Sequence, residues 1–209
     1  MSRSSQVKAK VERAAMELFA VGGFDGVSIA EIASAAGVSQ GALYRHYASK
    51  EELGWALFST AYLRTGEELD RIRASKAEFG DAVTSMVAHF CALFDADTAL
   101  FRFMLITQHG FLPRIPKGSR TPVDAVADLV ADAVARHHLK PIDPALGAAV
   151  IMGVILQSAT FHIYGRLDGP LRARVSELAR AAVAAVTALA QARRRRLRAR
   201  EHAKPRDGA

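Results

Sequence analysis

The chain has 209 residues, enough to bury a sizeable core as one large domain or as a small domain followed by a larger one. Half of its residues are hydrophobic and 23% are charged, which is typical of a soluble globular protein. The single cysteine, Cys91, excludes an internal disulfide framework and fits a reducing compartment, and its apolar neighbours favour a buried thiol over a nucleophile.

Signals for membrane insertion or export are weak. No uninterrupted apolar stretch reaches the ~18–20 residues that span a bilayer, and residues 1–6 lack the apolar core of a signal peptide. We therefore expect a cytoplasmic protein with no membrane partner.

The net charge of +7 comes mostly from one end of the chain. Residues 193–209 carry seven Arg and one Lys against two acidic residues, whereas residues 1–50 carry six basic and four acidic residues. Two interpretations of this arginine-rich tail stay open: a solvated helix end whose cations suit the helix dipole, or a second arm that contacts DNA. Charge alone therefore does not identify a nucleic-acid-binding region in the N-terminal part.

Helical periodicity runs through almost the whole chain, and no segment alternates convincingly as a strand does. We therefore predict an all-α fold. A first helix over residues 5–21 has an apolar face and ends at Gly22-Gly23.

Three helix-start signals follow in close succession. Ser28-Ile29-Ala30-Glu31 is a capping box, and the helix that it opens ends at Gly37. Ser39 caps a third helix, which we expect to reach about Tyr47. Ser49-Lys50-Glu51-Glu52 is a second capping box, and it opens a longer helix to about Ala74.

Longer helices are expected in the second half of the chain. A connection rich in Pro and Gly interrupts them at residues 109–122, and Asp168 is a candidate N-cap for the last helix. We expect helices over about residues 78–95, 98–108, 123–138 and 145–165, and a final one that starts after Pro170.

These elements divide the chain into two domains and a tail. Residues 1–50 are expected to form a helix-turn-helix domain, followed by a connecting helix over residues 50–74. Residues 76–195 are expected to form a larger helical domain, and residues 196–209 a basic, disordered tail.

The interval 28–47 has the pattern of a DNA-binding helix-turn-helix. Apolar residues of its first helix face Val38 and Leu43, so the two helices can pack at a steep angle. The outer face of the second helix is then free to enter a major groove. Its expected exposed residues are Gln40, Gly41, Ala42, Tyr44, Arg45 and His46. A helical hairpin packed for structure alone is the other interpretation.

Four residues near the helix starts suit contact with bases and phosphates. Gln40 can read a base edge, preferably adenine, by a bidentate hydrogen bond. Gly41 would allow close approach to DNA, with a neutral surface glycine as the alternative. Ser28 and Ser39 place helix N-termini where free amides and the helix dipole favour phosphate oxygens.

Four further side chains suit the DNA backbone. Tyr44 and His46 can donate to phosphates, and Arg45 can reach a phosphate or a guanine. Lys50 can meet the DNA backbone at a helix start.

Residues of about 7–60 closely resemble the tetracycline-repressor (TetR) family, with the spacing intact. The segments that carry the resemblance are Ala14-Ala15-Met16-Glu17-Leu18-Phe19, Gly22-Gly23-Phe24, Val27-Ser28-Ile29-Ala30-Glu31-Ile32-Ala33, Ala36-Gly37-Val38-Ser39, Gly41-Ala42-Leu43-Tyr44-Arg45-His46-Tyr47 and Ser49-Lys50-Glu51-Glu52-Leu53. The resemblance implies an all-helical bacterial homodimer with two DNA-reading heads and a larger, more variable effector domain. Many relatives carry threonine where this chain has Ala42, so a hydroxyl contact is lost there.

The resemblance implies DNA contacts at eight residues of this chain, and we add Arg45 and Tyr47 as further candidates. The candidate DNA-binding residues are therefore Ser28, Ser39, Gln40, Gly41, Ala42, Tyr44, Arg45, His46, Tyr47 and Lys50.

The helix expected over about residues 145–165 and the final helix each carry a row of apolar and small residues that suits a dimer interface. They could pair with their symmetry copies in a four-helix arrangement, and packing within one chain is the alternative. The candidate interface residues are Val150, Gly153, Gln157, Tyr164, Val175, Leu178, Ala182 and Leu189.

Aromatic residues and a few polar ones in the second half suit a pocket for a mainly hydrophobic small molecule, although the same residues could simply form core. The adjacent His137 and His138 diverge on a helix and make a poor metal pair, so we expect no metal and no cofactor. The candidate ligand-binding residues are Phe90, Phe94, Phe103, Met104, Gln108, Phe111, Gln157, Phe161 and His162.

We therefore predict a sequence-specific, DNA-binding transcriptional regulator: a homodimeric repressor that an unknown small ligand releases from a palindromic double-stranded operator. One alternative is a regulator or activator without a small-molecule effector. Another is an enzyme with a regulatory head, but the second half has no paired carboxylates, nucleophile–base pair or metal spacing, so we expect no enzyme. Gln40→Ala should relax sequence preference, and Lys50→Ala should weaken binding to all sequences and its salt dependence.

Overall fold

The computed structural model describes residues 3–202, with the side chains of residues 4–192. Every regular element in this part of the chain is helical, which confirms the all-α prediction. The elements are α1 (Arg3–Gly22), α2 (Ile29–Ala35), α3 (Gln40–Tyr44), α4 (Lys50–Ser75), α5 (Phe79–Ala96), α6 (Thr98–Phe111), η1 (Leu112–Arg114), α7 (Pro122–Ala135), α8 (Pro144–Ile163), η2 (Leu171–Arg174) and α9 (Val175–His202), where η marks a short 3-10 helix.

Three helix ends differ by three residues from those predicted. The helix α7 ends at Ala135 instead of about residue 138, so His137 and His138 follow the helix and do not lie on it, and His137 has a φ of 63°. The third helix, α3, ends at Tyr44 instead of about Tyr47, because the chain turns directly after it. The sixth, α6, continues to Phe111, past the predicted end at residue 108. In the tail, α9 reaches His202, and residues 203–209 lie outside the described part of the chain.

The helices group into two compact units. Unit 1 contains Met1–Thr65 and Ala96–Ser119, and unit 2 contains Gly66–Asp95 and Arg120–Ala209. The long helix α4 contributes residues to both units, and α6 belongs to unit 1. This grouping differs from the domain boundaries expected from the sequence mainly in the position of α6, and those boundaries stay predictions.

An aromatic cluster holds unit 1 together. The ring of Phe103 on α6 stacks on Phe19 of α1, with ring centroids 5.7 Å apart. Phe111 at the end of α6 makes an edge contact with Phe24 at 5.4 Å and a tilted contact with Phe58 of α4 at 5.5 Å. Buried aromatic rings contribute more to stability than any other apolar side chains. The sixth helix therefore supplies part of the core under α1.

The helix starts of unit 1 use the predicted local caps. Ser28 Oγ accepts from Glu31 N at 3.2 Å, and Ser28 N donates to Glu31 Oε2 at 2.7 Å, which confirms the first capping box. Ser49 Oγ accepts from Glu52 N at 3.1 Å, as predicted. The Glu52 carboxylate, however, reaches back to Ala48 N at 2.7 Å, one residue before the position that a capping box requires.

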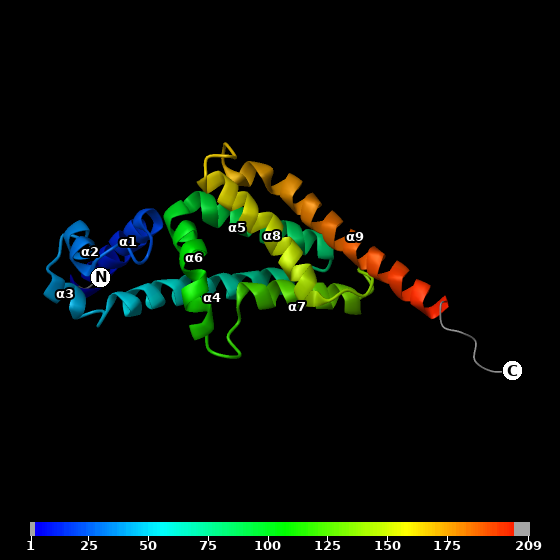
Figure 1. Cartoon of the computed structure of the whole chain (residues 1–209), viewed down its shortest axis with the longest axis horizontal. Coiled ribbons are helices and arrows are strands. Elements are labelled where there is room, and N and C mark those ends of the chain that lie inside the picture. Colours follow the sequence, from blue (N-terminus) through cyan, green and yellow to red (C-terminus); the bar gives the residue numbers. More distant parts are fainter. Residues whose placement is uncertain (1–2, 203–209) are drawn as a thin grey trace. The chain divides into compact units, whose positions relative to one another are not determined.

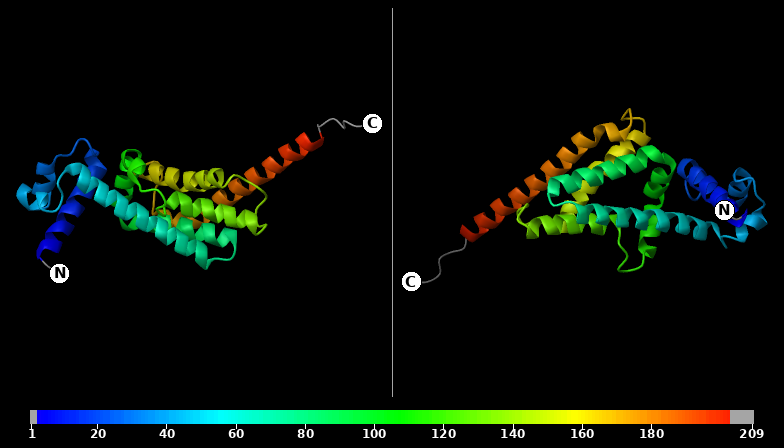
Figure 2. Two further views of the ribbon diagram at one scale, coloured as in Figure 1. Left: turned by 90° about the horizontal axis from the view of Figure 1, so that it is seen from below. Right: turned by 180° about the vertical axis from the view of Figure 1, so that it is seen from behind.

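In unit 2, α8 lies against both α7 and α9 (Figure 1, Figure 2). The final helix does not use Asp168 as its N-cap, so that prediction is wrong. It begins with η2, whose amides of Leu171 and Arg172 donate to the carboxylate of Asp95 at 2.9 and 3.0 Å. Asp95 lies on α5 and only 9% of its side chain is exposed. A side chain distant in sequence therefore takes the place of the local cap.

Cys91 lies one turn before Asp95 and is buried, as the sequence predicted. Burial, with a smaller contribution from the charge of Asp95, raises the pKa of the thiol to about 11. The thiolate is the reactive form of cysteine, so this side chain is an inert part of the core.

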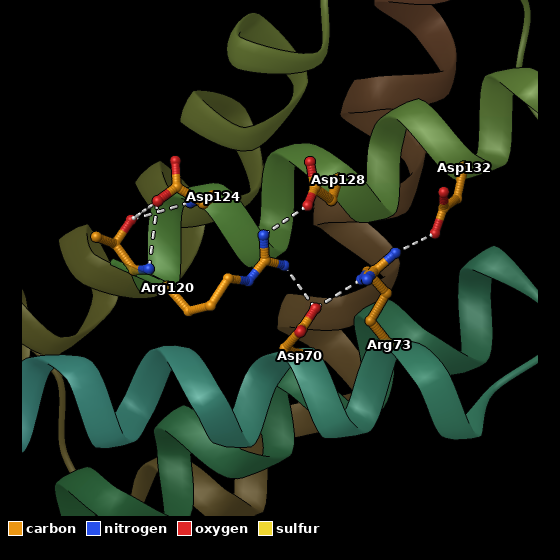
Figure 3. A network of polar contacts seen from close by, with 7 residues as sticks. Asp70, Arg73, Arg120, Asp124, Asp128 and Asp132 are labelled. Atoms are coloured by element: carbon orange, nitrogen blue, oxygen red, sulfur yellow. Dashed lines mark hydrogen bonds and ion pairs between the residues drawn. The ribbon is translucent and has the colours of Figure 1, made fainter. Parts of the chain in front are cut away.

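A chain of ion pairs joins α4 to α7 within unit 2. Figure 3 shows Arg73 and Arg120 both directed at Asp70, whose Oδ1 accepts from them at 2.8 and 2.6 Å. The second bond of Arg73 goes to Asp132 at 2.6 Å, and that of Arg120 goes to Asp128 at 2.8 Å. Positive and negative groups thus alternate along five side chains, and each arginine links α4 to α7.

By length and composition alone, α8 and the segment Leu171–Ala192 are apolar enough to cross a membrane. Within the most apolar stretch of each, 28% of α8 and 22% of Leu171–Ala192 is buried inside the protein. This is weak evidence for a membrane-spanning helix, because core helices of water-soluble proteins have the same length and composition.

Candidate nucleic-acid interface

The helix pair α2–α3 forms a compact support for an exposed reading face. Ile32 of α2 and Leu43 of α3 are fully buried between the helices. The turn between them passes through Gly37, whose φ of 65° lies in the left-handed region that favours glycine. Val38 N then donates to Ala33 O at 3.0 Å, and Ser39 Oγ accepts from Ala42 N at 3.1 Å to start α3.

The outer side of α3 is accessible, as the sequence predicted. Gln40, Gly41, Tyr44 and Arg45 are exposed, and His46 is half-buried. The cap residues Ser28 and Ser39 are also exposed, so the N-termini of α2 and α3 are accessible to solvent. The exposed side of α3 and the exposed starts of α2 and α3 therefore carry hydrogen-bonding groups and helix amides of the kind that DNA recognition uses.

Ala42 does not belong to this exposed row. The expectation that its side chain is accessible is wrong, because only 8% of the residue is exposed. The helix α3 is five residues long and packs against both α1 and α2, and the side that carries Ala42 and Leu43 is the one that is covered.

Tyr47 is buried as well, and its hydroxyl donates to Glu12 Oε1 of α1 at 2.5 Å. Burial raises the pKa of the Tyr47 hydroxyl, and the Glu12 carboxylate raises it further. The ring therefore fastens the end of the reading segment to α1 and does not face solvent.

Lys50, the first residue of α4, already has partners. Its Nζ donates to the backbone carbonyls of Phe24 and Val27 at 3.0 Å and to that of Asp25 at 3.4 Å. It also lies 4.9 Å from the centre of the Phe24 ring. The structure thus places this lysine against the turn between α1 and α2.

A second support of the head was not identified from the sequence. Arg13 of α1 pairs with Glu17 at 2.7 Å and with Asp97 at 2.7 Å, and the same Asp97 caps α6 through Leu100 N at 3.0 Å. Hydrogen bonds to Glu17, together with the Asp97 charge, raise the pKa of Arg13. Asp97 directly precedes the predicted start of α6, so its capping role has a local signal, whereas its contact with α1 has none.

The predicted ligand-binding residues divide between the two units. Phe103, Met104, Gln108 and Phe111 belong to unit 1, and the two phenylalanines are part of its aromatic core. Phe90, Phe94, Gln157, Phe161 and His162 belong to unit 2.

Within unit 2 these five side chains again differ in environment. Phe90 and Phe94 are buried, and the ring of His162 meets Phe94 edge-on at 5.0 Å while its Nε2 lies 2.9 Å from Gly169 O. Gln157 and Phe161 are exposed on α8. Among the described residues, no group of three or more His, Cys, Asp or Glu could hold a metal ion.

The predicted interface residues divide in a similar way. On α8, Gly153 and Gln157 are exposed and Val150 is half-buried, and Tyr164 at the C-cap of α8 is exposed. On α9, Val175, Leu178 and Leu189 are half-buried, but Ala182 is fully buried where α8 and α9 pack within the chain.

Known proteins share this N-terminal segment. The sequence profile of "Bacterial regulatory proteins, tetR family" matches residues 13–56. MftR of Mycobacterium tuberculosis, named as a candidate transcriptional regulator of mycofactocin biosynthesis, is 32% identical over 137 residues, which cover 65% of this chain and 67% of MftR.

Solved structures share the fold of almost the whole chain. The fatty acid degradation regulator FadR from Bacillus halodurans has a TM-score of 0.74 at 17% identity, over 87% of this chain and 96% of FadR. FadR from Bacillus subtilis, solved in complex with stearoyl-CoA, has a TM-score of 0.67 at 19% identity, over 84% and 97%.

A capped helix-turn-helix in an all-helical chain defines a DNA-binding transcriptional regulator. With the profile match and the MftR relative beside it, the family is clear. The chain belongs to the TetR family of bacterial transcriptional regulators, as the sequence resemblance predicted.

Proposed function

We propose that this regulator is a homodimeric repressor, which binds a palindromic operator through two copies of the α2–α3 pair and leaves it when a small, mainly hydrophobic ligand binds. The observation that carries the proposal is the exposed row on α3 beside two capped helix N-termini. This row supplies base-reading groups, and the two helix starts supply amides that can bind phosphates.

In this proposal Gln40 reads a base edge, and Tyr44, Arg45 and His46 contact the DNA backbone. All four are accessible or partly accessible at the start or the outer side of α3. Gly41 lies beside Gln40 without a side chain, which would let the backbone of α3 approach the groove closely. Ala42 and Tyr47 act through packing, since both are buried.

The dimer would form on the second apolar face of α8. Ile151, Ile155 and Ala159 on one side of this helix are buried in unit 2. Leu146 and Phe161, each 49% exposed, lie outside this buried side of α8, and Tyr164, 70% exposed, is the C-cap of the helix. Apolar side chains in an exposed stripe mark protein interaction sites, and a second copy would cover them.

The dimer is testable by one pair of variants. Phe161→Lys should dissociate the dimer in light scattering at micromolar concentration, because it buries a charge in the proposed interface. Val123→Lys is the matched control, since Val123 of α7 is 46% exposed and lies outside the α8 stripe. Equal mass for both variants and the wild-type chain would contradict this interface.

The ligand class has support from a structural relative, FadR of Bacillus subtilis with stearoyl-CoA. A fatty acyl-CoA is mainly hydrophobic along its chain, as the proposed effector is. We therefore take acyl-CoA esters as the first ligands to test.

One experiment tests repression and release together. In-vitro selection of bound duplexes should give a two-fold symmetric sequence, to which stearoyl-CoA or a shorter acyl-CoA weakens binding in gel shifts. Gln40→Ala should relax preference at one position of each half-site by ~1–3 kcal/mol. Absence of any selected sequence would refute the operator proposal, and a selected operator insensitive to an acyl-CoA series would favour a regulator without such an effector.

A further inference from the structure

One face of α4 holds the turn that joins α1 to α2. Lys50 and Gly54 are one helical turn apart, so both lie on this face. Both meet Phe24: the Lys50 ammonium lies 4.9 Å from the centre of its ring, and Gly54 lies directly against the ring edge. We call this pair of α4 residues the turn seat.

The Lys50 ammonium donates hydrogen bonds to the backbone carbonyls of the turn. It has three N–H donors and contacts three backbone carbonyls, those of Phe24, Asp25 and Val27. The two bonds of 3.0 Å have the length of good charge-assisted hydrogen bonds, and the third, at 3.4 Å, is longer. The lysine therefore has no donor left over in this arrangement.

The turn is packed too closely to move without its partners. A Cβ on Gly54 would lie 2.4 Å from the Phe24 ring, so the ring uses the space that glycine leaves. A Cβ on Gly26 would lie 2.6 Å from Gly22 O, so the turn also folds tightly on itself. Phe24 in turn packs on Phe19 of α1, with ring centroids 4.9 Å apart.

The turn ends at the residue that starts α2. Val27, whose carbonyl accepts from Lys50, directly precedes Ser28, the N-cap of α2. The position of the Lys50 ammonium therefore fixes where the free amides at the start of α2 point. These amides are among the groups through which we propose phosphate binding.

We propose that Lys50 is a positioning residue for DNA binding, which acts through the 22–27 turn and Ser28 and not by its own contact with a phosphate. This inference rests on the proposed DNA-binding face. It differs from the role that the sequence alone suggests for Lys50, a direct contact with the DNA backbone.

The test compares two variants that each remove one positive charge from the head, Lys50→Met and Arg45→Met. Affinity for a random-sequence duplex of about 30 base pairs, close to three helical turns, is measured by fluorescence anisotropy over a range of KCl concentrations. The measurements are made well below the unfolding midpoint of each variant. Thermal unfolding of each variant is recorded beside them.

Arg45→Met should lower the slope of log affinity against log salt by about 0.9 per head, because one phosphate contact is lost, and leave the unfolding midpoint unchanged. Lys50→Met should lower affinity about tenfold and lower the midpoint by several degrees, with a slope close to that of the wild-type chain. Lys50→Arg keeps the charge but spreads its donors over a planar guanidinium, so it should keep the wild-type slope and restore affinity and midpoint in part.

Two results would overturn the proposal. If Lys50→Met loses as much slope as Arg45→Met and keeps its midpoint, Lys50 contacts a phosphate directly. If its midpoint falls while the folded protein keeps wild-type affinity, Lys50 only stabilises the fold.

If Lys50→Met does not fold, NMR of the wild-type chain tests the proposal instead. The ¹⁵Nζ signal of Lys50 is followed as the duplex is added, and it is assigned by its absence from the spectrum of Lys50→Arg. A signal that stays in place when the duplex is added supports the positioning role, and one that moves to a phosphate-bound shift refutes it. Absence of DNA binding by the wild-type chain would instead refute the proposed function itself.

Discussion

Two helix starts in this chain meet the same physical need in different ways. At α2, Ser28 and Glu31, three residues apart, satisfy each other's backbone amides. At η2, the amides of Leu171 and Arg172 are satisfied by Asp95, 76 and 77 residues earlier in the chain. Free amides at a helix start need acceptors, but the acceptor can come from anywhere in the fold. The first solution is therefore visible in the sequence and the second is not.

Ion pairs of both units also include local and distant partners. Arg13 and Glu17 in unit 1 are separated by one helical turn, a spacing that the sequence displays, whereas Arg13 and Asp97 are 84 positions apart. Arg73–Asp132 and Arg120–Asp70 in unit 2 join residues 59 and 50 positions apart (Figure 3). Unit 1 is not built from local contacts alone, however, since α6 supplies part of its core.

The largest expected effect tests how far the helices of unit 1 depend on that distant element. Phe103→Ala removes a fully buried ring of α6 that stacks on Phe19, and should lower the free energy of unfolding by about 3–5 kcal/mol. Urea denaturation followed by circular dichroism measures the loss. Val21→Ala, at an exposed position of α1, is the control and should change it by less than about 0.5 kcal/mol. An equally small change for Phe103→Ala would show that α1–α4 fold without α6.

The next effect tests the long-range cap. Asp95→Ala leaves two amides of η2 without their acceptor at a site that is almost closed to water, and should cost about 2 kcal/mol. Amide hydrogen exchange should quicken at Leu171 and Arg172 and stay unchanged at the start of α2. Unchanged exchange at both residues would mean that η2 finds another acceptor.

These contrasts explain how much of the molecule the sequence could predict. The caps at Ser28 and Ser39 and the exposed row of α3 depend on neighbours within a few residues, and they were predicted correctly. Ala42 and Tyr47 differ because their burial depends on α1, which lies far from them in sequence.

The candidate pocket shows the same limit more strongly. Phe103 and Phe111 have the composition of a ligand site, but hydrophobicity cannot distinguish a cavity wall from a core. Which of the two an aromatic residue becomes depends on which helix packs beside it. Asp168 has the residue type and position of an N-cap, yet Asp95 occupies that role because α5 ends next to η2.

A smaller effect separates long-range from local ion pairs. Asp70→Asn weakens two bonds of the network and should lower the free energy of unfolding at neutral pH by about 1 kcal/mol, because its partners are partly exposed. Glu17→Gln, which removes the local pair with Arg13, is the control and should cost about 0.3–0.5 kcal/mol. Equal losses would mean that the two bonds of Asp70 together contribute no more than one exposed local pair.

The network should also depend on pH. Burial alone would raise the pKa of Asp70, but the hydrogen bonds and charges of Arg73 and Arg120 outweigh it and lower the pKa. Stability from a lowered carboxylate pKa is present above the unfolded value of about 3.9 and is lost as pH falls through the folded value. The difference between wild-type and Asp70→Asn chains should therefore shrink as pH decreases below about 4 in urea titrations. A difference that grows on acidification would reverse the sign of this argument.

The smallest effect returns to the local cap of α2. Ser28→Ala removes the acceptor for the Glu31 amide at an exposed helix start, so it should cost about 0.5–1 kcal/mol, less than Asp95→Ala at its enclosed site. Hydrogen bonds from the Ser28 hydroxyl and backbone lower the pKa of Glu31, so protonating Glu31 weakens the box as pH falls. In the NMR titration of Glu31, Ser28→Ala should move that pKa back toward its ordinary value. If the pKa stays low in the variant, the backbone amide of Ser28 alone holds the Glu31 carboxylate, and the start of α2 would depend on the turn seat at Lys50 more than on its own serine.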